Sequence, residues 1–117
     1  MGFRFEDLEI FKDAIEFAAV VYEAVKRFPD SERYILISQI KGAVNSISLN
    51  IAEGSGRGTK KEFSRFLDIA IGSCYEVVAC LMLSKRLDYI TDSELEAIKA
   101  EAETLCKRVN SFKRTLK

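Results

Sequence analysis

The chain has no histidine and no tryptophan, and only one proline and six glycines among its 117 residues. Histidine is the commonest general base and the commonest protein metal ligand. Its absence excludes a helical di-iron site built on Glu-x-x-His motifs and a ribonuclease that relies on an Arg/His pair. Among the carboxylates that remain, Glu53 and Glu76 show no pairing typical of an active site. We therefore predict that the protein is not an enzyme and holds no metal or cofactor.

The chain also has no net charge, because the 18 Lys and Arg residues are balanced by 18 Asp and Glu residues. Any electrostatic function must come from an uneven distribution of these charges. No run of about 18 apolar residues is long enough to span a bilayer, and the N-terminus lacks the basic-then-apolar order of a signal peptide. These features predict a single cytoplasmic domain over residues 1–117 that does not enter a membrane.

Cysteine is scarce, and Cys74, Cys80 and Cys106 are widely spaced in apolar surroundings. A disulfide framework usually has an even number of cysteines, and a zinc site needs tighter spacing such as C-x2-C. We expect reduced structural thiols that serve as small hydrophobic side chains.

Apolar residues recur at three- and four-residue spacing in four segments, which predicts helices at about residues 6–28, 32–53, 59–87 and 91–116. Short connections favour antiparallel neighbours, so the expected fold is all-α, an up-down-up-down antiparallel four-helix bundle. The first segment carries two apolar stripes, one beginning at Leu8 and one at Ile10. That width fits either a deeply buried helix or a helix that also packs on another subunit.

The predicted ends of the helices rest on short motifs. Thr59 with Glu62, and Thr91 with Glu94, have the spacing of capping boxes. We expect Gly54 to end the second helix, and Gly72 to permit a close approach between helices because glycine inside a helix otherwise costs up to about 1 kcal/mol. The glycines around Arg57 do not have the spacing of a phosphate-binding loop.

A polar seam runs beside the apolar seam of the second helix. We expect three side chains of this seam to form a structural polar network with a carboxylate of the third helix. The four residues are Gln39, Asn50, Glu53 and Glu76. The alternative is that the seam faces water.

Basic residues collect where the second connection and the end of the fourth helix should meet. The N-terminus of a helix carries partial positive charge, so lysines there are unfavourable. The presence of Lys60 and Lys61 at such a position therefore suggests a functional role for their charge. A basic end of this kind can bind phosphate backbones by releasing counterions. The candidate nucleic-acid-binding residues are Arg57, Lys60, Lys61, Arg65, Lys107, Arg108, Lys113 and Arg114. The alternative is a solvated surface that is partly neutralised by the acids near Glu6.

Several segments, in matching order over nearly the whole chain, resemble the 23S rRNA-intervening sequence proteins. They are Phe5-Glu6-Asp7-Leu8, Phe28-Pro29, Ser38-Gln39-Ile40, Ser46-Ile47-Ser48-Leu49-Asn50-Ile51-Ala52-Glu53-Gly54, Glu62-Phe63-Ser64-Arg65-Phe66-Leu67 and Ala70-Ile71-Gly72-Ser73-Cys74-Tyr75-Glu76. Two departures stand out. Ser48 replaces a proline that the family often has, and Lys41-Gly42 replaces a frequent pair of basic residues.

The resemblance implies a ring-shaped homopentamer of four-helix bundles, with no catalytic residues. Some members are encoded within insertions in large-subunit ribosomal RNA genes. A related branch is the accessory protein of diversity-generating retroelements, which binds nucleic acid and a reverse transcriptase through a basic surface. We therefore expect an oligomeric scaffold that binds RNA or DNA. The alternative is a protein-interaction module, such as a partner of a reverse transcriptase, for which nucleic-acid binding is secondary.

Overall fold

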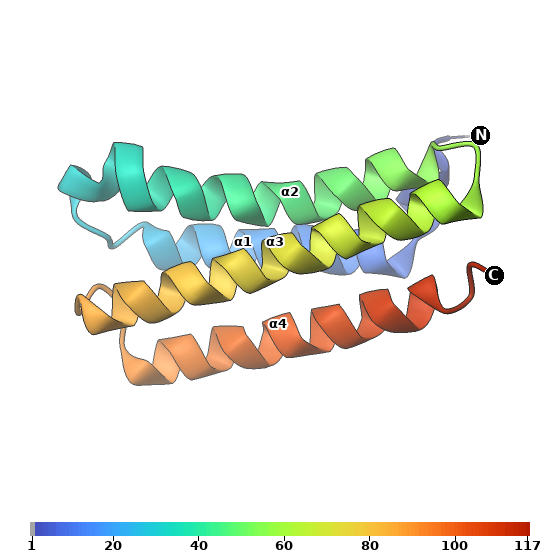
Figure 1. The fold of residues 1–117 in the computed structure, drawn as a ribbon. Helices are drawn as coiled ribbons and strands as arrows, with labels where there is room; N and C mark the ends of the chain where they lie inside the picture. Colours follow the sequence, from blue (N-terminus) through green and yellow to red (C-terminus); the bar gives the residue numbers. More distant parts are fainter. Residues whose placement is uncertain (1) are drawn as a thin grey trace.

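Four long helices account for most of the computed structural model, which describes residues 2–117 (Figure 1). They are α1 (Glu9–Val25), α2 (Ser38–Ser55), α3 (Lys60–Arg86) and α4 (Asp92–Lys113). Each helix packs on two neighbours, in the cyclic order α1, α2, α3, α4, and the elongated bundle measures 43 × 24 × 22 Å. Residues 2–117 contain no β-strand. The predicted all-α four-helix bundle is confirmed.

The stripe of α1 that begins at Ile10 supplies the core. Ala14 and Val21 are completely buried, and Phe17 is only 4% exposed. The other stripe lies on the flank, where Ile15 is 45% exposed. The helix begins later than expected, because Leu8 is extended and separates α1 from a 3-10 turn at Arg4–Asp7.

A π-helical turn at Arg33–Ile37 precedes α2, so the regular α-helix starts at Ser38 rather than near residue 32. The turn leaves Tyr34 and Ile35 largely exposed while Leu36 enters the core. Further along, α2 continues without interruption through Ser48, whose hydroxyl donates to the Asn45 carbonyl at 3.3 Å.

Gly54 and Gly72 differ in how closely other side chains approach them: Gly54 lies one residue before the end of α2, near its expected position, and has an additional packing role, whereas Gly72 does not. Gly54 lies inside α2 with a negative φ, and a Cβ there would come within 2.7 Å of Phe66 Cβ and 2.9 Å of Phe63 Cδ1. It is therefore the glycine that permits the close approach of α2 and α3. A Cβ at Gly72 would meet nothing within 4 Å, so no helix of the same chain approaches closely there.

The helix caps differ in completeness. Thr91 accepts from the Glu94 amide at 3.1 Å while Glu94 accepts from the Thr91 amide at 2.9 Å, which is a full capping box. Thr59 accepts from the Glu62 amide at 3.1 Å, but the Glu62 carboxylate pairs with Arg65 instead of returning to Thr59. The start of α3 therefore has only half of the predicted box.

By length and composition alone, α3 could cross a membrane, since its most apolar 18-residue window has a mean hydropathy of 1.8. The expectation that no segment could do so was therefore too strict. In the bundle, however, the apolar stripe of α3 is used in the core, where Leu67, Val77 and Leu81 are completely buried. A core helix of this kind passes the same test, so the observation is weak evidence for a membrane.

Candidate nucleic-acid interface

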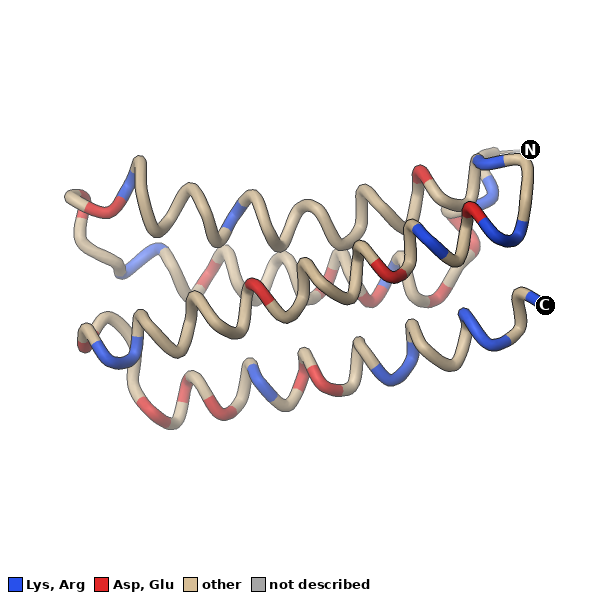
Figure 2. Tube along the Cα trace, in the orientation of Figure 1, with Lys and Arg blue, Asp and Glu red and all other residues tan. Residues whose placement is uncertain are grey.

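Basic side chains gather at the end of the bundle where both termini and the α2–α3 connection lie (Figure 2). We call this the basic end. It is made by the N-terminal turn, the α2–α3 connection, the first two turns of α3, and the last turn of α4 with the tail that follows. Its cations are Arg4, Arg57, Lys60, Lys61, Arg65, Lys113, Arg114 and Lys117.

Two arginines of the basic end share one aromatic ring. The guanidinium carbons of Arg57 and Arg65 lie 4.7 and 4.8 Å from the centre of the Phe66 ring. Each arginine also has a carboxylate nearby in sequence, with Arg57 Nη2 at 2.6 Å from Glu53 and Arg65 Nε at 3.2 Å from Glu62. The ring and the ion pairs hold both guanidinium groups at the surface in defined positions.

The Glu62–Arg65 pair also changes the proton affinity of both partners. The hydrogen bond from Arg65 lowers the pKa of Glu62, and the same bond raises the pKa of Arg65. Both side chains are solvent-exposed, so this ion pair stabilises the fold little. Its effect is to keep a negative charge beside one of the candidate phosphate-binding groups.

The tail after α4 reaches the start of α3. Lys60 Nζ donates to the carbonyl of Lys117 at 3.1 Å, and Lys113 Nζ lies 2.5 Å from Asp68 Oδ1 of α3. The structure therefore brings the C-terminal cations to those of the α2–α3 connection, as the topology predicts. Within residues 2–117, Lys61 and Arg114 form no ion pair.

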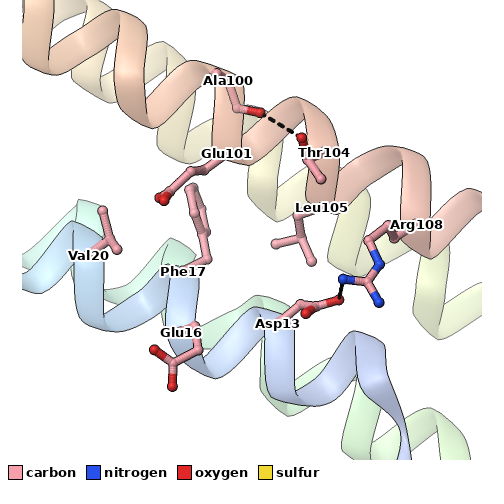
Figure 3. Close-up of a pocket in the computed structure, with 9 residues that line it drawn as sticks. All are labelled: Asp13, Glu16, Phe17, Val20, Ala100, Glu101, Thr104, Leu105 and Arg108. Carbon is pink, nitrogen blue, oxygen red and sulfur yellow. Dashed lines mark hydrogen bonds and ion pairs between the residues drawn. The ribbon is translucent and has the colours of Figure 1, made fainter.

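Two of the candidate residues lie elsewhere. Arg108 faces α1, where its Nη1 atom is 2.8 Å from Asp13 Oδ2 in an ion pair that lacks hydrogen-bond geometry. It lines a groove of about 400 Å³ between α1 and α4 together with Glu16 and Glu101 (Figure 3). Lys107 borders a different pocket, between α3 and α4. Neither residue is part of the basic end.

Arg4 is a member of the basic end that sequence reasoning missed. Its guanidinium carbon lies 5.1 Å from the centre of the Phe63 ring, in the first turn of α3. The sequence drew attention only to the acids that follow Arg4. Glu6 and Asp7 do lie in the same N-terminal turn, so they offset part of the positive charge.

The side chains of the expected polar network divide into three local groups. Gln39 Nε2 donates to Glu76 at 3.4 Å, which links α2 to α3. Asn50 donates to the backbone and side chain of Ser46, whose hydroxyl accepts from Ser73 at 2.8 Å. Glu53 turns away to Arg57. The seam thus joins α2 and α3 at two points but is not one continuous network.

The arrangement offers positive charge and hydrogen-bond donors rather than an acid–base pair. Among residues 2–117, no group of three or more Cys, Asp or Glu side chains is placed to hold a metal ion. Glu53 and Glu76, the carboxylates considered for catalysis, point to different partners, Arg57 and Gln39.

Comparison with known proteins agrees with the fold. No curated protein matches the chain. A crystal structure of a protein of unknown function from the S23 ribosomal protein family of Bacteroides thetaiotaomicron superposes with a TM-score of 0.78, at 24% identity, over 89% of this chain and 97% of that one. The family model for 23S rRNA-intervening sequence proteins matches residues 6–111. The chain belongs to the 23S rRNA-intervening sequence protein family.

Proposed function

We propose that this protein is a cytoplasmic, non-enzymatic scaffold that binds RNA or DNA through its basic end. The observation that carries the proposal is the paired placement of the Arg57 and Arg65 guanidinium groups on the Phe66 ring, near the exposed residues Lys60 and Lys61. Arginine and lysine side chains held at a surface bind phosphates through charge-assisted hydrogen bonds. The local carboxylates are partners that a phosphate can replace without rearranging the helices.

Self-association would multiply this surface. We include in the proposal that copies of the chain assemble, as the family resemblance implies, into a ring of five. Several copies of the basic end on one particle would raise the avidity for a long nucleic acid without any new type of contact.

An exposed face of α2 and α3 supports the self-association. We call it the outer face, and it contains Gly42, Leu49, Ile69, Gly72 and Leu83. Leu49 is 64% exposed, Leu83 50% and Ile69 40%, and neither glycine would bring a Cβ within 4 Å of another atom. A partner backbone can approach such a surface closely while it covers the apolar side chains.

Nucleic-acid binding is tested by fluorescence anisotropy with a structured RNA, a duplex DNA and a single strand over a range of salt concentrations. In the wild type, the affinity should fall steeply as salt rises. The triple variant Lys60→Glu, Lys61→Glu, Arg65→Glu should bind at least about tenfold more weakly, with a salt dependence reduced by about three phosphate contacts.

The matched control places the same change of net charge at the opposite end of the bundle, as Lys26→Glu, Lys85→Glu, Arg86→Glu. This control should retain most of the wild-type affinity, and circular dichroism should show that both variants are folded. Equal loss of affinity in the two variants would mean that only net charge matters. Unchanged affinity in the folded triple variant at Lys60, Lys61 and Arg65 would contradict nucleic-acid binding by the basic end.

Assembly is tested separately, by sedimentation of Leu49→Glu and Ile15→Glu. Leu49 lies on the outer face, whereas Ile15 lies on the exposed stripe of α1. We expect only Leu49→Glu to dissociate the oligomer. Dissociation by Ile15→Glu alone would place the interface on α1 instead, and a monomeric wild type would contradict the assembly.

A second candidate function is a protein-interaction module, such as an accessory partner of a reverse transcriptase. The exposed apolar side chains of the outer face favour this alternative, because apolar burial is screened little by salt. A partner bound in this way would stay bound at salt concentrations that release nucleic acid, and Leu49→Glu would weaken its binding more than the Lys60 triple variant.

A further inference from the structure

Two of the three cysteines meet in a pocket between α3 and α4. Cys74 of α3 and Cys106 of α4 line this pocket of about 310 Å³, together with Tyr75, Val78 and Lys107. The Cys74 thiol donates to the carbonyl of Ala102 at 3.8 Å. Ala102 precedes Cys106 by one helical turn, so Cys74 lies directly against the turn of α4 that carries Cys106.

The two thiols differ in access. Cys74 is only 2% exposed, whereas Cys106 is partly exposed on the wall of the pocket. A small oxidant that enters the pocket therefore reaches Cys106 first. Cys80 is also buried, but it lies about one and two-thirds turns further along α3 and does not line this pocket.

We propose that Cys74 and Cys106 form a dithiol modification site, which hydrogen peroxide oxidises to a disulfide between α3 and α4 and which an external thiol reduces again. The site is independent of the basic end and of the outer face. It also departs from the expectation that all three cysteines serve only as small hydrophobic side chains; that role remains for Cys80.

The reaction has two steps. The Cys106 thiol ionises, and its thiolate attacks one oxygen of hydrogen peroxide. The O–O bond breaks, and the departing hydroxide takes up the proton that Cys106 released, which gives a Cys106 sulfenic acid and one water. Cys74 sulfur then attacks the sulfenic sulfur, the S–S bond forms and the S–O bond breaks. The departing hydroxide takes the Cys74 proton to give a second water. In total, the two thiols lose two electrons and two protons, and the peroxide is reduced to two waters.

Proton affinities agree with this order of events. The neighbouring Cys74 thiol lowers the pKa of Cys106, against the effect of burial, while the proximity of Cys106 together with burial raises the pKa of Cys74. Of the two thiols, Cys106 therefore ionises more readily, and Cys74 holds its proton more firmly. Burial, with a contribution from Glu76, raises the pKa of Cys80, which makes it an unreactive internal reference.

The test exposes the reduced full chain to hydrogen peroxide and identifies the products by peptide mapping without reductant. We expect a Cys74–Cys106 cross-link within one chain, a loss of two hydrogens in the intact mass, and full reversal by dithiothreitol. Cys80→Ser should form the same cross-link. Cys74→Ser should leave a Cys106 sulfenic acid that dimedone traps, whereas Cys106→Ser should form neither product.

A second measurement needs no variant. Under native conditions N-ethylmaleimide should modify Cys106 in the wild type at least about tenfold faster than Cys80. The proposal is overturned if Cys80 reacts as fast as Cys106, if the cross-link joins Cys80 or two separate chains, or if peroxide gives only sulfinic acid at Cys106.

Discussion

At the end of the bundle that holds the α3–α4 turn, polar side chains join segments that are far apart in the sequence. At the basic end the ion pairs of Arg57 and Arg65 join residues only four and three positions apart. The pair between Lys113 and Asp68, also at the basic end, joins α4 to α3. We call the first of these two ends the cross-linked end. There Arg27 pairs with Glu94 of α4, and the Tyr89 hydroxyl donates to Glu32 at 2.9 Å. The Tyr89 ring also lies 5.4 Å, centre to centre, from the ring of Phe28.

This difference distinguishes charged side chains that stabilise the tertiary structure from charged side chains that remain available to bind a ligand. A contact between helices fixes their relative position, so removing it loosens the tertiary structure. A pair such as Glu53–Arg57 or Glu62–Arg65 stabilises a helix by only about 0.3–0.5 kcal/mol. A phosphate can take the place of the carboxylate at little cost to stability, which makes the basic end the better candidate for binding.

The largest effect is expected from disturbing the close packing of α2 on α3 at Gly54, next to the basic end. Gly54→Ala would place a Cβ 2.7 Å from Phe66 Cβ. Overpacking of this kind lowers the free energy of unfolding by about 1–3 kcal/mol. Urea denaturation followed by circular dichroism measures the change.

Gly72→Ala is the matched control for that substitution, because it adds the same methyl group to a helix where nothing of the same chain lies within 4 Å. Since Gly72 lies on the outer face, both variants are compared at a protein concentration low enough to keep the chain monomeric. It should raise the free energy of unfolding by up to about 1 kcal/mol through helix propensity. Equal effects of the two substitutions would show that α2 and α3 are not in close contact at Gly54.

The next effect compares the caps at the two ends. Thr91→Ala removes half of a complete capping box at the cross-linked end and should cost about 1 kcal/mol. Thr59→Ala at the basic end removes a single hydrogen bond without a reciprocal partner, so it should cost less. Thermal unfolding of both variants orders the two losses, and a greater loss for Thr59→Ala would contradict the asymmetry.

A smaller effect should appear when the local carboxylates of the basic end are neutralised. Glu53→Gln with Glu62→Gln removes two negative charges beside Arg57 and Arg65, and the affinity for RNA should rise about two- to fivefold. Anisotropy titrations at constant salt measure it. The control, Glu23→Gln with Glu96→Gln, neutralises two local pairs away from the basic end and should change the affinity much less. A lower affinity for the first variant would show that the carboxylates position the arginines for binding.

Much of this fold was predictable because helix periodicity reports burial directly. The apolar seam predicted for the second helix, from Leu36 in the π-helical turn through Ile47 to Ile51 in α2, is buried throughout. The choice between the two stripes of α1 was not predictable, since both have helical spacing and only the position of the neighbouring helices decides it. The roles of Gly54 and Gly72 could not be assigned for the same reason, because the space around a glycine is a tertiary property.

The candidate site was predictable in part. The acids that pair with Arg57 and Arg65 stand four and three residues away in sequence, so their pairing could have been anticipated from helix geometry. The contacts of Lys113 with Asp68 and of Arg108 with Asp13 join different helices and have no such signal. They depend on which faces of the helices meet.

The smallest expected effect is on the free energy of unfolding at acid pH, and it again compares the two ends of the bundle. The Thr91 backbone amide lowers the pKa of Glu94 below its ordinary value of 4.5, with smaller contributions from the Thr91 hydroxyl and Arg27. Because the pKa is lower in the folded chain than in the unfolded chain, this stabilisation is present above about pH 4.5 and is lost as the pH falls through the folded value.

Glu94→Gln should therefore reduce the loss of the free energy of unfolding at acid pH, measured by urea denaturation at a series of pH values. Glu62→Gln should reduce this loss less, because the Glu62 side chain is 42% exposed against 29% for Glu94 and is bound mainly by Arg65. The reverse order would mean that the cross-linked end holds its carboxylates no more firmly than the basic end.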